Sequence, residues 1–108
     1  MIDVLMAAAA WIVAALAPPP PPPTTLPAVL VAIRECESGG SYAAENPTST
    51  ASGGFQYLDS SWRSYGYAAR YGVARASMAS PAQQDEAALD TLARSGTTPW
   101  NASRGCWG

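Results

Sequence analysis

The sequence predicts a small α-rich domain, α+β at most, behind an N-terminal tail that is not part of the folded unit. Two segments, 28–38 and 81–95, place apolar residues at helical spacing. Glycines follow both segments, where helices commonly end. No segment shows a convincing alternation of apolar and polar residues, which is the pattern of a half-buried strand. These three observations favour helices over sheet.

The composition limits what the chain can do. The 108 residues are 48% hydrophobic, enough for one small core, and the formal net charge is −2. Such a weakly acidic chain is a poor fit for a phosphate backbone, so we expect no nucleic-acid partner. Without histidine and with only two cysteines, it lacks Ser-His-Asp and Cys-His nucleophile systems and the usual ligands of a zinc site. We therefore expect no metal site, and any chemistry must use carboxylates.

Residues 1–17 read as a signal-like segment or an anchor. The apolar run 4–17 is shorter than the roughly 20 residues of a membrane span but fits the core of a signal peptide. Ala15 and Ala17 form the small-residue pattern of a cleavage site, whereas Asp3 stands where positive charge is expected and Pro18 would follow the cut. The sequence predicts export and leaves open removal of the segment, membrane attachment through it, or packing of an apolar helix on the domain.

Residues 18–27 form a proline-rich linker. Six consecutive prolines at positions 18–23 can form neither helix nor sheet and predict polyproline II. At about 3.1 Å per residue this spacer is roughly 19 Å long. A folded domain over residues 28–108 follows it.

The first half of that domain predicts two helices joined by a loop. Pro27 stands near the start of the first helix, 28–38, and Gly39 ends it. Residues 41–53 are rich in Ser, Thr, Ala and Asn and predict a loop. The following "GGFQY" predicts a short extended or turning piece, and "DSSWRSYGY" a short helix capped by Asp59 or Ser60.

The last helix carries the clearest signals. Ser80 is a predicted N-cap, Pro81 occupies the first helical position, and Gln83 completes a capping box. Gly96 closes the helix. Its predicted apolar face consists of Ala88, Leu89, Leu92 and Ala93.

Glu37 is the candidate catalytic group. On a helix over 28–38, Cys36 and Glu37 continue the apolar stripe that includes Ile33, so Glu37 lies at the edge of that stripe in the last turn. Partial burial and the negative end of the helix dipole both disfavour the charged carboxylate, although Arg34 would oppose this if it reached. A protonated carboxyl group is what a general acid requires. The alternative is a solvated glutamate at a frayed helix end.

Cys36 and Cys106 are the only cysteines of the chain. Because the chain carries export signals, we expect a disulfide between them, which would tie the C-terminus to the first helix. The loop-entropy model gives such a bridge about 4 kcal/mol of stabilisation. Two free thiols are the alternative.

Four short motifs resemble one known family. "CESGG", "GGFQY", "SSW" and the final "CW" occur in order, as in the catalytic domain of resuscitation-promoting factors and related transglycosylase-like proteins of actinobacteria and their phages. The resemblance covers about residues 28–108. It implies a compact lysozyme-like fold with a glycan cleft. It also implies cleavage of the β-1,4 bond between N-acetylmuramic acid and N-acetylglucosamine in peptidoglycan, with no cofactor.

Carried over position by position, the resemblance implies that Glu37 is the catalytic acid. The implied substrate-binding residues are Tyr42, Gly54, Gln56, Tyr57, Ser61 and Trp62. Three of them depart from the family pattern: Tyr42 replaces a tryptophan, Ser61 a frequent threonine and Tyr57 a phenylalanine. The loop 46–52 is longer than usual, so the sugar preference stays open. Core packing is the alternative role of the aromatic residues, and we expect it for Trp62 and Trp107.

A second catalytic carboxylate is hard to find in the sequence. Glu35 points away from Glu37 on a helix, Asp59 is a predicted cap, and Glu45 alone lies in a loop that can face a cleft. The lack of a partner suits a lytic transglycosylase, in which Glu37 protonates the leaving oxygen and then deprotonates the 6-hydroxyl of the sugar. The alternative enzyme is a hydrolysing muramidase with Glu45 as base or nucleophile.

Two readings without catalysis also stay open. One is a glycan-binding module that keeps the fold, and the other is a structural protein of a phage particle or a membrane-anchored partner. For the enzyme, peptidoglycan glycan strands are the expected partner. We expect a monomer that is secreted or associated with the cell wall, anchored through residues 4–17, or carried by a phage particle.

Overall fold

The structure of the protein is a computed structural model that describes residues 25–108. The predicted segment 1–17 and the prolines at 18–23 lie outside the described residues. The helical elements, in chain order, are α2 (Ala28–Ser38), α3 (Asp59–Ser64), α4 (Tyr67–Tyr71), η1 (Ala76–Met78), α5 (Pro81–Ser95), η2 (Thr98–Ser103) and α6 (Arg104–Trp107). Extended pairing in this part of the chain is confined to two isolated bridges, Glu45–Ser52 and Ser52–Tyr57. The predicted α-rich fold is therefore confirmed.

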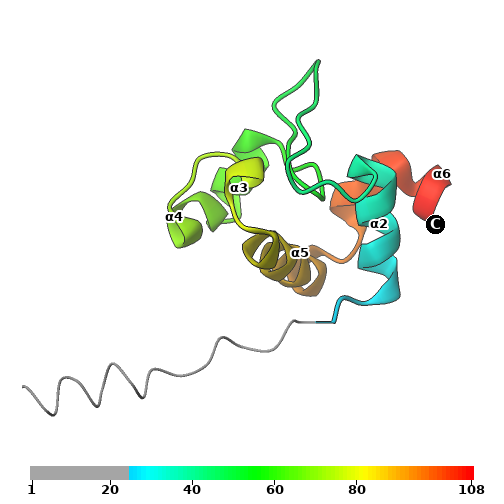
Figure 1. The fold of residues 1–108 in the computed structure, drawn as a ribbon. Helices are drawn as coiled ribbons and strands as arrows, with labels where there is room; N and C mark the ends of the chain where they lie inside the picture. Colours follow the sequence, from blue (N-terminus) through cyan, green and yellow to red (C-terminus); the bar gives the residue numbers. More distant parts are fainter. Residues whose placement is uncertain (1–24) are drawn as a thin grey trace, which may run out of the picture.

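The helices form two groups around α5. Figure 1 shows α2 and α6 side by side, α3 and α4 together on the opposite side, and α5 between them. The segment between α2 and α3 (green) rises above the helices as a long loop. This loop and η2 frame the space in front of the C-terminal end of α2.

Helix α2 has the predicted bounds. Pro27 precedes it, and Gly39 ends it in the left-handed conformation (φ 64°), donating its N–H to the carbonyl of Glu35 at 2.9 Å. Glycine adopts this conformation without the steric cost of a Cβ atom. Leu30 and Ile33 are fully buried on one face of the helix. Glu37 follows Ile33 by one turn, so it lies at the rim of the core as predicted.

Helix α5 begins with the predicted capping box. The backbone N–H of Gln83 donates to Ser80 Oγ at 3.1 Å, and the N–H of Ser80 donates to Gln83 Oε1 at 3.0 Å. Its buried face was only partly predicted. Ala88 is buried and Leu89 and Leu92 pack on the core, but Ala93 is exposed. The fully buried positions are Gln84, Ala87, Ala88 and Thr91.

Two of these buried residues, Gln84 and Thr91, are polar. Their side chains form hydrogen bonds with buried polar groups of neighbouring segments. Thr91 Oγ1 lies 2.8 Å from the hydroxyl of Tyr57 and 2.7 Å from that of Tyr67. Burial raises the pKa of both phenols, so both hydroxyls stay neutral. A hydropathy pattern assigns polar residues such as Gln84 and Thr91 to the surface. The predicted buried face of α5 was therefore shifted toward Ala93.

The prediction for the region after "GGFQY" was wrong in two respects. Asp59 is the first residue of α3 rather than its cap, Leu58 precedes the helix, and no side chain caps it. The carboxylate of Asp59 instead accepts from Arg75 Nε at 3.3 Å. The expected helix over 59–67 also ends earlier, at Ser64, because Gly66 adopts φ 90° before α4 begins at Tyr67. Arg75, 16 residues away along the chain, binds the carboxylate of Asp59 that the sequence had assigned to the helix cap.

The disulfide between Cys36 and Cys106 is present, with a Cα–Cα distance of 6.0 Å. It joins the last turn of α2 to α6. The two cysteines are separated by 70 positions, so the bridge closes most of the domain into one loop.

Reduction of this disulfide is expected to lower the melting temperature by more than about 5 °C, because the loop-entropy model assigns it several kcal/mol. Circular dichroism melts with and without reductant measure the effect. A double variant, Cys36→Ser with Cys106→Ser, should melt at the temperature of the reduced protein, and reductant should not change its melting temperature. Equal melting temperatures of oxidised and reduced protein would contradict a stabilising bridge.

Candidate active site

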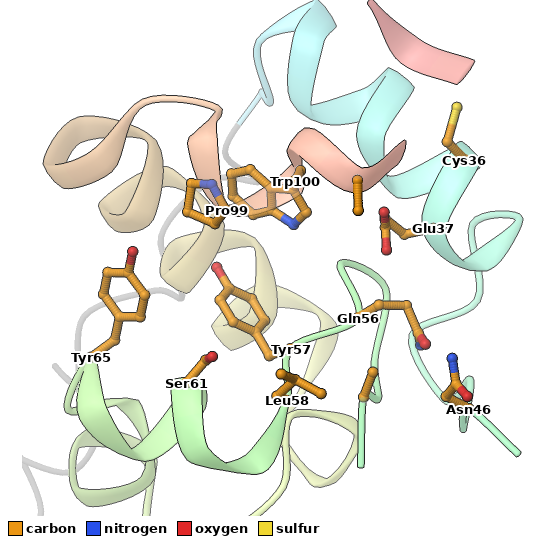
Figure 2. Close-up of a pocket in the computed structure, with 12 residues that line it drawn as sticks. Cys36, Glu37, Asn46, Gln56, Tyr57, Leu58, Ser61, Tyr65, Pro99 and Trp100 are labelled. Atoms are coloured by element: carbon orange, nitrogen blue, oxygen red, sulfur yellow. The ribbon is translucent and has the colours of Figure 1, made fainter. Parts of the chain in front are cut away.

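An open cavity of about 290 Å³ lies in front of the C-terminal end of α2. Its walls come from the end of α2, the loop after it, α3 and η2. Figure 2 shows the side chains that line it. Four of the residues predicted for the site are among them, namely Glu37, Gln56, Tyr57 and Ser61.

Glu37 is half-buried and faces this cavity, with its carboxylate on the side of Trp100 (Figure 2). Arg34 does not reach it. Arg34 Nη1 donates to the hydroxyl of Tyr42 at 2.8 Å, and Nη2 lies 3.5 Å from Glu35 Oε1. Among residues 25–108, none of the four ion pairs includes Glu37. The Glu37 carboxylate therefore faces the cavity without an ion pair to an arginine of residues 25–108.

The cavity wall that faces away from the loop after α2 is apolar and aromatic. Trp100 is 4% exposed and is fixed by a hydrogen bond from its Nε1 to the carbonyl of Phe55 at 3.0 Å. Tyr57 packs edge-on against it, with ring centroids 6.2 Å apart. Pro99 and Tyr65 extend this surface (Figure 2). Flat apolar walls beside a carboxyl group suit a ligand with apolar ring faces.

Gln56 lies on the other side of the cavity, at the end of the turn formed by residues 53–56. Gly53 has φ 83°, and a Cβ there would stand 2.6 Å from Gln84 Oε1. Gln56 has φ 55° and is the one non-glycine residue with positive φ in the described part of the chain. Its Nε2 donates to the carbonyl of Gly53 at 2.9 Å and so closes the turn. Left-handed backbone at a non-glycine residue costs about 1–3 kcal/mol and clusters at functional sites.

Gln84 holds this turn from behind. It is 1% exposed. Its Oε1 accepts from the N–H of Gly54 at 2.8 Å, and its Nε2 donates to the carbonyls of Ala79 at 2.9 Å and Tyr42 at 3.1 Å. One side chain thus connects the turn, the loop after α2 and the start of α5. Sequence reasoning missed it because a glutamine after a capping box gives no sign of burial.

Three other residues predicted for the site lie behind the walls. Tyr42 places its hydroxyl between Arg34 Nη1 and Asp85 Oδ1, the latter at 2.7 Å. Gly54 is buried, and a Cβ there would stand 3.1 Å from the ring of Tyr42. Trp62 is fully buried and donates to the carbonyl of Val73 at 3.0 Å. These three support the cavity without lining it.

The core role expected for Trp62 is confirmed, and Trp107 is half-buried against the core. Sequence reasoning missed Asn46 and Pro99. It counted Tyr65 and Trp100 only among the aromatic residues whose flat side chains suit sugar rings. Aromatic type alone does not separate a lining residue from a core residue. Asn46 lies in the part of the loop where the motif pattern gave no position-by-position match.

Glu37 is the only carboxylate that lines the cavity within residues 25–108. Glu45 is bound elsewhere, because Arg75 Nη2 lies 2.8 Å from its Oε2 and Ser77 Oγ donates to its Oε1 at 2.6 Å. In the same described region, no three histidine, cysteine or acidic residues are grouped as metal ligands. None of the helices found there has the length and apolar character to cross a membrane.

The chain is similar to proteins named as probable transglycosylases. A "Probable transglycosylase SceD" of Staphylococcus aureus (strain Newman) is 41% identical over 73 residues, which are 68% of this chain and 31% of that protein. "Probable transglycosylase SceD 3" of Staphylococcus saprophyticus is 39% identical over 71 residues, or 66% of this chain and 29% of that protein. The chain thus spans about a third of the length of the curated relatives it matches. The sequence model of the transglycosylase-like domain matches residues 27–103, and the chain belongs to this family.

Proposed function

We propose that this protein cleaves the β-1,4 bond between N-acetylmuramic acid and N-acetylglucosamine in peptidoglycan, as a lytic transglycosylase with Glu37 as its single catalytic carboxylate. The observation that supports this most is that Glu37 alone among the carboxylates of residues 25–108 lines an aromatic-walled cavity. The family and the names of its staphylococcal relatives support the same class of activity. Within that family we place the chain beside the resuscitation-promoting factors, on the motifs "CESGG" and "GGFQY".

One carboxyl group is enough for this reaction. Glu37 donates its proton to the glycosidic oxygen as the bond between that oxygen and C1 of the muramic acid breaks. The N-acetylglucosamine leaves with a free 4-hydroxyl. The 6-hydroxyl oxygen of the muramic acid then bonds to C1 and returns its proton to Glu37. No water is consumed and no cofactor is needed, so the product is a 1,6-anhydro sugar.

The hydrolysing alternative needs a second carboxylate about 5–9.5 Å from the first. Glu45 was the candidate, but its two oxygens are held by Arg75 and Ser77 and it does not line the cavity. The bound state of Glu45 therefore favours the single-carboxylate mechanism.

Glu45→Gln is expected to lower the rate of cleavage by less than about tenfold, equivalent to under 1.4 kcal/mol of barrier. Initial rates on purified peptidoglycan measure this. Asp59→Asn is the matched control, since Asp59 also pairs with Arg75 and lies outside the cavity lining. A loss of several orders of magnitude in Glu45→Gln alone would favour the hydrolysing mechanism.

Incubation with purified peptidoglycan sacculi tests the proposed function itself. An active enzyme lowers the turbidity of the suspension and releases soluble muropeptides. Protein that sediments with the sacculi and releases nothing would instead be a binding module. Protein that neither binds nor cleaves would favour the structural role.

For location we propose a monomer that is secreted or associated with the cell wall, with residues 4–17 as signal or membrane attachment, or carriage on a phage particle. The disulfide supports an oxidising compartment.

A further inference from the structure

Two side-chain amides line the cavity together with Glu37, those of Asn46 and Gln56. Both are half-buried. Figure 2 shows Gln56 extending from the side of Glu37 toward Asn46, with the Asn46 nitrogen on the side of Gln56. The hydrogen bonds that each amide makes fix which of its atoms is left for a ligand.

Asn46 uses its oxygen inside the loop. Its Oδ1 accepts from the backbone N–H of Thr48 at 2.9 Å and from Thr48 Oγ1 at 3.0 Å. A backbone N–H can only donate, so the atom that faces it must be the amide oxygen. The NH₂ group of Asn46 is therefore the end left for a ligand, and it is a donor.

Gln56 is oriented in the opposite sense. Its Nε2 donates to the carbonyl of Gly53 at 2.9 Å and to that of Ala44 at 3.5 Å. Carbonyl oxygens only accept, so the nitrogen must face them and Oε1 is the end left for a ligand. The hydrogen bond to Gly53 fixes the orientation of this amide.

These two groups are accessible. Within residues 25–108, Arg34 Nε is the only buried side-chain nitrogen or oxygen without a hydrogen-bond partner. The unused donor of Asn46 and the unused acceptor of Gln56 are not such atoms, so both keep some exposure to solvent. A donor and an acceptor presented in one cavity complement a secondary amide, which offers one carbonyl oxygen and one N–H.

We propose that Asn46 and Gln56 recognise the acetamido group of a sugar bound in the cavity. Asn46 Nδ2 donates to the acetamido carbonyl, and Gln56 Oε1 accepts from the acetamido N–H. This rests on the proposed function for the identity of the glycan, and it makes the N-acetyl group a determinant of specificity. A de-N-acetylated sugar carries an ammonium group instead, which offers donors only and leaves the Asn46 donor unpaired.

The test is a binding measurement in the Glu37→Gln background, so that no glycan is cleaved. The probes are tetra-N-acetylchitotetraose and its fully de-N-acetylated counterpart, at a pH where the amines are protonated, followed by calorimetry. The acetylated probe should bind at least about tenfold more tightly, a difference of about 1.4 kcal/mol. Equal affinities, or no binding of either probe, would overturn the proposal. Both probes lack peptide, so a preference between them excludes a stem-peptide amide as its source.

Asn46→Asp supplies the matched variant. Aspartate keeps an oxygen for Thr48 and replaces the donor with an acceptor that attracts ammonium. The preference for the acetylated probe should fall at least about tenfold or reverse. Gln83→Glu is the control, since it adds the same charge outside the cavity lining and keeps a residue suited to the capping box. An unchanged preference in Asn46→Asp would also overturn the proposal.

Peptidoglycan de-N-acetylated on only one of its two sugars shows which acetamido group is read. Slower cleavage of one substrate assigns the site to that sugar, and equal cleavage of both at the native rate counts against the proposal. The outcome is separable from the proposed function. Cleavage without any acetyl preference would remove this inference alone, whereas an acetyl preference without cleavage would remove the enzymatic function alone.

Discussion

Glu37→Gln is expected to abolish cleavage of peptidoglycan while leaving the fold intact. Glutamine keeps the shape of the side chain but has no proton to give, and general acid catalysis contributes about 10²–10⁴-fold to a rate. Because no other carboxylate of residues 25–108 lines the cavity, nothing replaces the lost group. Release of muropeptides should fall at least about a hundredfold.

The melting temperature provides the control for this variant. Glu37 takes part in none of the ion pairs of the described residues, so the variant should melt within about 2 °C of the native protein. Cleavage at more than a few per cent of the native rate would remove Glu37 from its assigned role.

Gln84→Leu is expected to cause a large loss of stability. It leaves the N–H of Gly54 and the carbonyls of Ala79 and Tyr42 without their partner in a buried region. Each unsatisfied buried group costs about 1–3 kcal/mol, so we expect a loss of at least about 3 kcal/mol. Denaturant unfolding measures the change in the free energy of unfolding.

Gln83→Leu is the matched control for Gln84→Leu. It lies one position earlier and removes only one half of the capping box, worth about 1 kcal/mol. The activity of Gln84→Leu should fall as well, because the turn carrying Gln56 loses its rear support. A Gln84→Leu protein as stable as the native one would show that the three hydrogen bonds contribute little.

Local signals in the sequence were enough to predict helix α2, which carries Glu37, and the start of helix α5. The bounds of α2 and the start of α5 follow from Pro27, Gly39 and the capping box of Ser80 with Gln83. The disulfide was predictable because the chain has only two cysteines. Each of these features depends on residue type and short spacing along the chain.

Features that depend on distant contacts were not predictable. Arg75 pairs with Asp59, which is therefore not a helix cap, and with Glu45, which does not line the cavity. Gln84 is buried because the turn at Gly54 offers it a donor. Trp62 and Tyr42 occupy motif positions that were expected to bind substrate, but both lie behind the cavity walls. A motif shows which residues follow one another in the sequence and does not show which side chains are exposed.

The masses of the glycan ends released from purified peptidoglycan test the central claim most directly. If Glu37 acts alone through the 6-hydroxyl of the sugar, the muropeptides end in 1,6-anhydro-N-acetylmuramic acid. Each is then one water lighter than its hydrolysed counterpart, and Glu45→Gln gives the same products. Reducing-end muropeptides as the sole product, together with an inactive Glu45→Gln protein, would contradict it and identify a hydrolysing muramidase.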